Sequence, residues 1–116
     1  MKRFNDLGVN DAFIKALNEL SIKQPTEIQE QVIPLLLNSE SDLIGQAQTG
    51  TGKTAAFGLP ILQNTDVKLN EIQTLVLCPT RELGQQIAKQ FFKFTKYSDR
   101  IFTEAVYGGE KIDKQI

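Results

Sequence analysis

The sequence predicts an α/β fold in which helices cover both faces of an open, mostly parallel sheet. Two observations indicate this class. Three short apolar segments typical of strands alternate with segments of helical periodicity, and a glycine-rich loop joins the first of these strands to a helix. In such sheets ligands bind at the carboxyl ends of the strands, so we expect function in the loops that follow strands.

Two helices are predicted ahead of the sheet. Asn10 is a suitable N-cap for the first, because its side chain can accept a hydrogen bond from a backbone N–H of the first turn. The apolar positions of that helix recur at helical spacing: Phe13, Ile14, Leu17 and Leu20. Thr26 begins the second helix after Pro25, and Pro34 is expected to kink that helix or limit its length.

The predicted strands are residues 42–45, 73–78 and 102–107. The middle strand carries three consecutive apolar residues, Leu75, Val76 and Leu77, as expected of a strand buried on both faces. The helices predicted between and after the strands are residues 53–62, 81–94 and 111–116. Pro60 is expected to kink or end the first of them.

The composition limits the possible functions. A chain of 116 residues allows one compact unit, and its net charge of −1 gives no overall positive field to attract nucleic acid. The lack of histidine and the single cysteine, Cys78, exclude a Ser-His-Asp triad and argue against a zinc site of the usual ligands. No apolar segment is long enough to span a bilayer and the start is not a signal peptide, so we expect a cytoplasmic protein.

The most specific motif runs from Ala47 to Thr54 and reads Ala-Gln-Thr-Gly-Thr-Gly-Lys-Thr. It follows a predicted strand and opens a predicted helix, which is the context of a phosphate-binding P-loop. Glycines let backbone N–H groups approach phosphate oxygens, and the helix N-terminus adds a positive dipole end. The strict pattern has glycine in place of Ala47, a small departure because alanine is nearly as compact.

This loop predicts a site for the polyphosphate of a nucleotide, formed by Ala47, Gln48, Thr49, Gly50, Thr51, Gly52, Lys53 and Thr54. Lys53 is expected to place its ammonium group near the β and γ phosphates. The Thr54 hydroxyl is expected to ligate Mg²⁺, which takes oxygen ligands. Lys53 and Thr54 are therefore the candidate catalytic residues, and Thr54 is the candidate metal ligand.

Upstream of the loop, the segment Gln24–Gln29 allows two interpretations. The amide of Gln29 can pair with the N6 and N7 edge of adenine, which would favour ATP over GTP. Thr26 and Gln29 also have the spacing of a capping box, in which each side chain bonds the backbone N–H of the other residue. Residue chemistry alone favours the capping box.

Taken together, these segments resemble the N-terminal half of the first RecA-like domain of DEAD-box RNA helicases. Pro25, Thr26, Ile28 and Gln29 match the core of that family's Q motif, and Phe4 fits its isolated upstream aromatic residue. The resemblance extends from Phe4 to Gly109. It implies a partial RecA-like P-loop NTPase domain, divided into a Q-motif region at 1–30 and a truncated ATP-binding domain at 31–116.

The resemblance also implies an adenine site, in which Gln29 reads the base and Phe4 and Ile22 contact it, and a role for Thr26 in coupling this segment to the P-loop. The family has a Gly-aromatic pair where this chain has Ser21-Ile22. Ile22 can cover an adenine face by apolar contact but cannot stack as an aromatic ring, so weaker adenine affinity is expected. The implied cofactors are ATP and Mg²⁺, with ADP as the product ligand.

Two further loops resemble motifs that contact RNA in this family. They contain Pro79, Thr80 and Arg81, which begin a segment similar to motif Ia, and the pair Gly108-Gly109. The resemblance implies that these residues contact the RNA backbone without reading its sequence. On residue chemistry alone, Thr80 is the N-cap of the following helix and the glycine pair is a turn.

The family's Asp-Glu-Ala-Asp (Walker B) motif, its Ser-Ala-Thr motif and its second RecA-like domain have no counterpart in the 116 residues. Phosphoryl transfer depends on positioning and electrostatics that those parts supply. We therefore expect these residues alone to have negligible ATPase activity and to self-associate through exposed apolar surface. From the parent protein we expect RNA-dependent ATP hydrolysis and RNA unwinding. Two other hypotheses are a P-loop kinase for a small metabolite and a complete, non-catalytic module that binds nucleotide or RNA.

Overall fold

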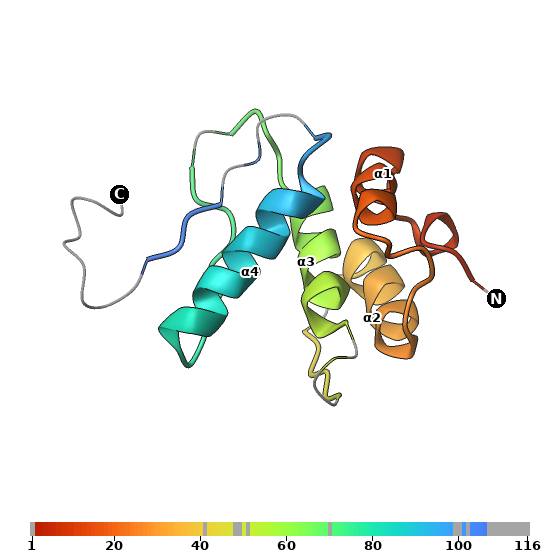
Figure 1. The fold of residues 1–116 in the computed structure, drawn as a ribbon, viewed down its shortest axis with the longest axis horizontal. Helices are drawn as coiled ribbons and strands as arrows, with labels where there is room; N and C mark the ends of the chain where they lie inside the picture. The colour runs from red at the N-terminus through yellow and green to blue at the C-terminus, as the bar shows by residue number, and fades with distance from the viewer. Residues whose placement is uncertain are drawn as a thin grey trace.

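The computed structural model describes residues 2–40, 42–47, 50, 52–69, 71–98, 101 and 103–106. The secondary structure of these residues is helical: η1 (Asn5–Leu7), α1 (Asp11–Glu19), α2 (Glu27–Asn38), α3 (Lys53–Gln63) and α4 (Arg81–Phe94). α3 packs between α2 and α4, and α1 also contacts α4 (Figure 1). None of the helices in the described part of the chain is long and apolar enough to cross a membrane.

Three of the predicted helix starts are confirmed by their N-caps. The Asn10 side chain accepts a hydrogen bond from the Phe13 N–H at 3.2 Å, and Thr80 caps α4 in the same way. At α2 the capping box is complete. The Thr26 hydroxyl accepts from the Gln29 N–H at 3.4 Å, and Gln29 Oε1 accepts from the Thr26 N–H at 2.9 Å. Short-range side-chain chemistry therefore fixes where these helices begin.

Neither internal proline ends its helix. α2 continues past Pro34 to Asn38, and α3 continues past Pro60 to Gln63. An interior proline removes one backbone donor and its ring crowds the carbonyl four residues earlier, so other interactions must offset its cost. At α2 the Asn38 side chain donates to the Pro34 carbonyl at 2.9 Å. Neither helix therefore ends at its proline, and the other expectation, that Pro34 and Pro60 kink their helices, stays a prediction.

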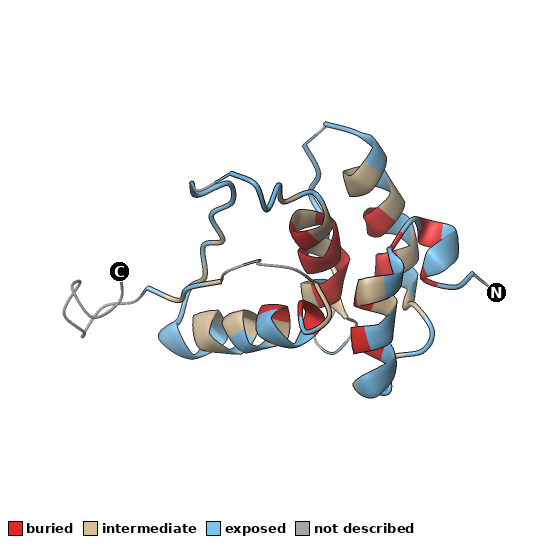
Figure 2. Ribbon diagram, turned by 90° about the horizontal axis from the view of Figure 1, so that it is seen from above, coloured by how far each residue is buried: buried red, intermediate tan, exposed pale blue. Residues whose placement is uncertain are grey.

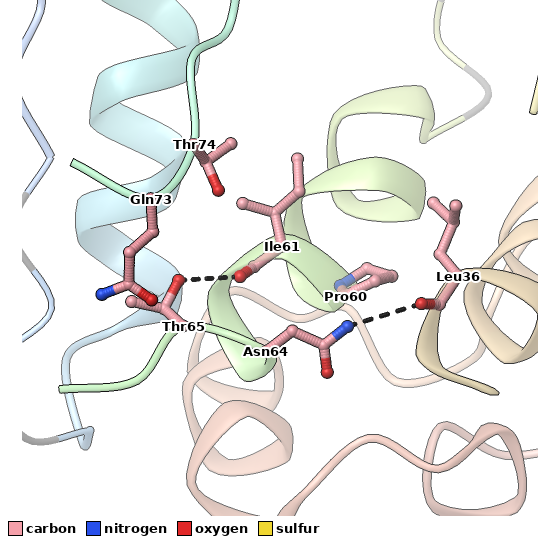
Figure 3. Close-up of a pocket in the computed structure, with 7 residues that line it drawn as sticks. All are labelled: Leu36, Pro60, Ile61, Asn64, Thr65, Gln73 and Thr74. Carbon is pink, nitrogen blue, oxygen red and sulfur yellow. Dashed lines mark hydrogen bonds between the residues drawn. The ribbon is translucent and has the colours of Figure 1, made fainter. Parts of the chain in front are cut away.

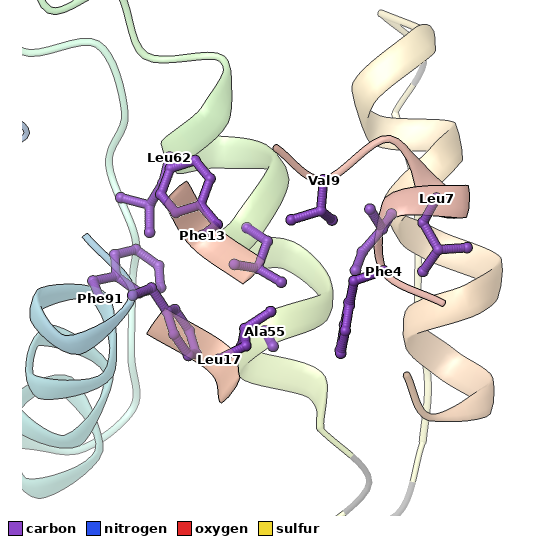
Figure 4. Close-up of a cluster of buried hydrophobic side chains, with 11 residues drawn as sticks. Phe4, Leu7, Val9, Phe13, Leu17, Ala55, Leu62 and Phe91 are labelled. Carbon is purple, nitrogen blue, oxygen red and sulfur yellow. The ribbon is translucent and has the colours of Figure 1, made fainter. Parts of the chain in front are cut away.

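One hydrophobic core joins the N-terminal segment to the helix that follows the glycine loop. Figure 4 shows Phe4, Leu7 and Val9 on one side of α3, and Figure 2 shows buried residues concentrated on α3 and on the neighbouring helices. The core consists of Phe4, Leu7, Val9, Phe13, Leu17, Ile33, Ala55, Leu59, Leu62, Phe91 and Phe94. Its burial, the main stabilising term, fixes the segment before α2 against α3.

α1 ends in a left-handed turn at Ser21, whose φ is 63°. The Ser21 N–H donates to the Asn18 carbonyl at 3.1 Å and the Ile22 N–H donates to the Leu17 carbonyl at 2.9 Å, which is the bonding pattern of a Schellman motif. The turn places Ile22 against the core. Glycine adopts this conformation freely, whereas a residue with a Cβ is strained by about 1–2 kcal/mol.

Replacing Ser21 with glycine is therefore expected to raise the free energy of unfolding by about 1 kcal/mol, since relief of strain outweighs the greater freedom of glycine in the unfolded chain. Urea unfolding of the full-length protein measures the change. Ser39→Gly is the matched control, because Ser39 has an ordinary φ of −140° and gains no relief. A loss of stability in both variants would contradict the assignment of strain to Ser21.

The three predicted strands form no sheet within the described residues, where 42–45, 73–78 and 103–106 have no regular secondary structure. The expected burial of 73–78 on both faces is wrong here. Leu75 is 77% exposed and Leu77 is 84% exposed, while Val76 packs against the core. No described segment covers their outer side. Phe102, Tyr107 and the helix predicted at 111–116 lie outside the described residues.

Glu19 ties the end of α1 to the end of α4. Its carboxylate lies 2.9 Å from the Lys96 ammonium and accepts a hydrogen bond from the Tyr97 hydroxyl. The hydrogen bond from Lys96 lowers the pKa of Glu19, and the bond to Glu19 raises the pKa of both Lys96 and Tyr97. The Lys15 ammonium lies 4.3 Å from the centre of the Tyr97 ring. Because Glu19 and Lys96 are both exposed to solvent, their ion pair orients the side chains more than it stabilises the fold.

Candidate nucleotide-binding site

α3 begins without a side-chain cap, whereas α1, α2 and α4 each have one. Its N-cap residue is Gly52, with a φ of 84°. The first N–H groups of an α-helix have no partner inside the helix. At α3 the N-cap residue has no side chain to take their place, so among the described residues they are left for a ligand. A negatively charged ligand fits this position, because the helix N-terminus carries the positive end of its dipole.

The glycine loop in front of α3 is open and carries a cation. Gly50 is exposed, has a φ of 81° and has no heavy atom within 4 Å of the position that a Cβ would occupy. The exposed Lys53 reaches back across the loop and donates to the carbonyl oxygen of Ala47 at 2.7 Å. Thr54 is half-buried in the first turn of α3.

Gln48, Thr49 and Thr51, which the sequence also assigns to the loop, lie outside the described residues. The loop is therefore seen at Ala47, Gly50 and Gly52, where its two described glycines both have positive φ. That conformation agrees with the reason for expecting glycine in a phosphate-binding loop, which is backbone freedom. The phosphate contacts themselves stay a prediction.

The buried side chain of Gln29 links the start of α2 to this loop. Gln29 is 2% exposed, and its Nε2 donates to the Gly52 carbonyl at 3.1 Å while its Oε1 accepts from Thr26. The capping-box interpretation is confirmed. The amide retains one N–H and one lone pair, which are the donor and acceptor that N7 and N6 of adenine require. Adenine recognition by Gln29 stays a prediction.

The space beside Gly52 is filled by this glutamine. A Cβ at position 52 would lie 2.3 Å from Gln29 Nε2 and 3.2 Å from the Thr26 hydroxyl oxygen. Atoms that close cannot coexist without movement, so the glycine is required by the contact as well as by its φ. The expected coupling of Thr26 to the P-loop thus has a physical basis in the packing of Thr26 and Gln29 against Gly52.

Phe4 and Ile22 are placed in the core. Phe4 is 3% exposed and belongs to the cluster that includes Leu7 and Phe13, and Ile22 is half-buried against the same cluster. Neither lies in an open pocket beside the loop. The sequence could not reveal this, because the burial of an isolated aromatic residue depends on how α1 and α3 pack. Contact of either residue with adenine stays a prediction.

The residues expected to contact RNA are only partly described. Thr80 caps α4 by accepting the Leu83 N–H at 3.2 Å, as its residue chemistry alone suggests. Pro79 and Arg81 are exposed beside it at the start of the helix. Gly108 and Gly109 lie outside the described residues. The N-terminal end of α4 therefore presents an exposed guanidinium and backbone, and its role with RNA stays a prediction.

A cavity of about 310 Å³ lies at the opposite end of α3 from the loop (Figure 3). Three of its polar side chains, Asn64, Thr65 and Gln73, are already hydrogen-bonded within the protein. Asn64 donates to the Leu36 carbonyl at 3.4 Å, and Thr65 donates to the Ile61 carbonyl at 2.8 Å. Gln73 bonds the backbone of Asp66. Among the described lining residues, only the Thr74 hydroxyl forms no hydrogen bond, and one such group does little to orient a ligand, so the loop is the better candidate site.

A glycine loop ahead of an uncapped helix, beside a buried glutamine, is typical of a P-loop nucleotide-binding protein. The chain belongs to the DEAD/DEAH box helicase family, whose model matches residues 26–116. It is 46% identical over 116 residues to the ATP-dependent RNA helicase CshA of Listeria monocytogenes, covering all of this chain and 22% of that protein. The chain thus spans about a fifth of that relative.

Solved structures give the same family. A DEAD box protein from the hyperthermophile Methanococcus jannaschii superposes with a TM-score of 0.88 at 37% identity, over 97% of this chain and 31% of that one. Dbp5 of S. cerevisiae, bound to RNA and ADP BeF3, superposes with a TM-score of 0.84 at 30% identity, over 97% of this chain and 30% of that one. The resemblance inferred from the sequence motifs is confirmed.

Proposed function

We propose that this chain is the nucleotide-binding and RNA-contacting N-terminal part of an ATP-dependent DEAD-box RNA helicase. The observation that carries the proposal is the uncapped start of α3 at Gly52, held against the buried Gln29 at 3.1 Å. Membership of the helicase family supports it, as do a relative named as an ATP-dependent RNA helicase and a similar structure bound to RNA and ADP BeF3.

In this proposal the polyphosphate of ATP lies at the first turn of α3. The backbone N–H groups there and the Lys53 ammonium supply positive charge, and residues 47–54 surround the phosphates. The Thr54 hydroxyl is an oxygen donor of the type that Mg²⁺ takes, so it is the residue that would hold the ion together with phosphate oxygens. Gln29 recognises adenine with its free N–H and lone pair. The expected contacts of Phe4 and Ile22 with the base require these side chains to move out of their core positions.

RNA is proposed to lie at the start of α4. Pro79, Thr80 and Arg81 contact its backbone, and Gly108 and Gly109 are proposed to contact it as well. Contacts to phosphate and sugar position the strand without reading its sequence. The proposal therefore predicts binding of unrelated RNA sequences with similar affinity.

We further propose that residues 42–45, 73–78 and 102–107 pair in a parallel sheet in the full-length protein, with 1–30 as the Q-motif region and 31–116 as part of a RecA-like domain. The support is the superposition on a DEAD box protein with a TM-score of 0.88, together with the exposure of Ile44, Leu75 and Leu77. A sheet would bury these apolar side chains. The 116 residues alone are expected to self-associate through them, which sedimentation measures.

The test of the proposed function is ATP hydrolysis by the full-length protein with and without RNA. We expect single-stranded RNA to stimulate turnover, and Lys53→Ala to abolish it while leaving the fold intact, because the variant loses the cation beside the phosphates. The 116 residues alone should show negligible turnover. Turnover that ignores RNA but phosphorylates a small metabolite would contradict the proposal and favour a P-loop kinase.

A further inference from the structure

The outward face of α4 is basic and carries an exposed aromatic ring. Lys89, Phe92 and Lys93 are all exposed, and Phe92 keeps 78% of its accessible surface. Residues three and four apart lie on the same face of a helix, so these side chains form one continuous patch. The opposite face of α4 carries Phe91 and Phe94, which are buried in the core. Phe92 thus lies outside the core, although Phe91 and Phe94 of the same helix are buried in it.

Neither lysine of this patch forms an ion pair with a described residue. Lys89 and Lys93 have no ion-pair partner among the described residues, in contrast to Lys96, whose ammonium is 2.9 Å from Glu19. The only acidic residue of α4 is Glu82, in the first turn. Residues 83–98 contain three lysines and no carboxylate side chain. Within the described part of the chain, Lys89 and Lys93 therefore place positive charge without an ion-pair partner on this face, although the net charge of the chain is −1.

The patch continues the surface that holds Arg81. From Arg81, exposed or half-buried positions on this face follow at Gln85, Lys89 and Phe92, each three or four residues further on. α4 spans 14 residues, or about 20 Å at the rise of an α-helix. A strand bound at the N-terminal end of α4 can therefore run along the helix and meet Lys89, Phe92 and Lys93 in turn.

We propose that the outward face of α4, formed by Lys89, Phe92 and Lys93, is a second RNA-contacting surface that holds single-stranded RNA leaving the site at Arg81. The lysines pair with phosphates and the Phe92 ring stacks on an unpaired base. Basic side chains that track a backbone, with an aromatic ring that accepts any base, are the chemistry of sequence-tolerant binding to single strands. This inference rests on the proposed function, because it extends the RNA path from the start of α4.

The test compares two neutralised variants of the full-length protein. Lys89→Gln/Lys93→Gln removes the patch, and Lys2→Gln/Lys68→Gln removes the same charge from exposed lysines elsewhere. Each lost phosphate contact with a single strand lowers the log–log salt slope of the binding constant by about 0.7. For two contacts we expect a slope smaller by about 1.4 and an affinity about 25-fold lower at 0.1 M salt. Fluorescence anisotropy with a mixed-sequence RNA oligonucleotide measures both.

Phe92→Ala separates stacking from charge. We expect it to weaken binding of the single-stranded oligonucleotide at least about fivefold, and to leave the salt slope and the affinity for an RNA duplex unchanged, because duplex bases are already stacked. Melting temperature and Mg·ATP affinity should stay at the values of the unaltered protein in all these variants.

Equal RNA affinity in the two neutralised variants would overturn this inference, as would a patch variant that loses binding only to phosphatidylserine vesicles. Either result would leave the proposed function standing, provided that Arg81→Ala still weakens RNA binding. If the unaltered protein binds no RNA at all, it is the proposed function that fails.

Discussion

Gly52→Ala is expected to lower the affinity of the full-length protein for Mg·ATP about a hundredfold. The φ of 84° costs a residue with a Cβ about 1–2 kcal/mol. The new Cβ would lie 2.3 Å from Gln29 Nε2, and Gln29 is buried and bonded at both ends of its amide. Moving it breaks at least one hydrogen bond, at about 1 kcal/mol. The free loop avoids these costs, about 2–3 kcal/mol together, by leaving the binding conformation, and binding must restore that conformation, so they appear as a roughly hundredfold loss of affinity.

Gly50→Ala is the matched control for this variant. Gly50 has almost the same φ, 81°, but nothing lies within 4 Å of its would-be Cβ. Its alanine variant therefore reports backbone strain alone. Isothermal titration with Mg·ATP should place Gly50→Ala between the unaltered protein and Gly52→Ala, and Gln29→Ala should reduce the difference by removing the clash. Equal affinity of the two glycine variants would show that the contact with Gln29 does not shape the loop.

Gly58→Ala is expected to destabilise the protein by about 1–2 kcal/mol, although alanine usually favours a helix. A Cβ at position 58 of α3 would lie 2.6 Å from the ring of Phe91 in α4. Phe91 is 4% exposed and packs edge-on against Phe57 with ring centres 6.2 Å apart, so its ring has no free space to enter. Overpacking costs about 1–3 kcal/mol, and a contact this short lies in the upper part of that range, so about 1–2 kcal/mol remains after the helix-propensity gain of about 1 kcal/mol is subtracted.

The control variant, Gly84→Ala, is expected to stabilise the protein instead. Gly84 lies in α4, and the nearest atoms to its would-be Cβ, in Cys78, are 4.0 Å away. Gly84→Ala should therefore stabilise the protein by about 0.5–1 kcal/mol through helix propensity alone. Urea unfolding measures both variants, and Phe91→Leu in the Gly58→Ala background should recover stability. Stabilisation of the protein by Gly58→Ala would show that α3 and α4 pack less closely than described.

The helices could be predicted because their signals are local. Asn10, Thr26 and Thr80 each bond a backbone N–H only three residues away, so the residue type and its position are enough. The glycine loop could be predicted for the same reason, since its chemistry lies in one short segment. The effect of the prolines could not be predicted, because it also depends on the packing of α2 against α3, which neither helix sequence specifies.

Long-range contacts could not be predicted. The bond from Gln29 to Gly52 joins residues 23 positions apart, and nothing in either segment specifies it. The burial of Phe4 and the close approach of Gly58 to Phe91 likewise depend on how helices pack. The sheet is the hardest case, because an apolar run such as 75–77 shows a preference for strands but not which neighbours will pair with it.

The account depends on the first turn of α3 and the Lys53 ammonium holding the polyphosphate of a nucleotide. Isothermal titration of the full-length protein with Mg·ATP, beside its Lys53→Ala variant, tests this most directly. We predict uptake of one nucleotide per chain by the unaltered protein and a loss of at least about tenfold in affinity in the variant, since one charge-assisted contact contributes about 1.5–3 kcal/mol. No uptake, or equal uptake by both proteins, would contradict it.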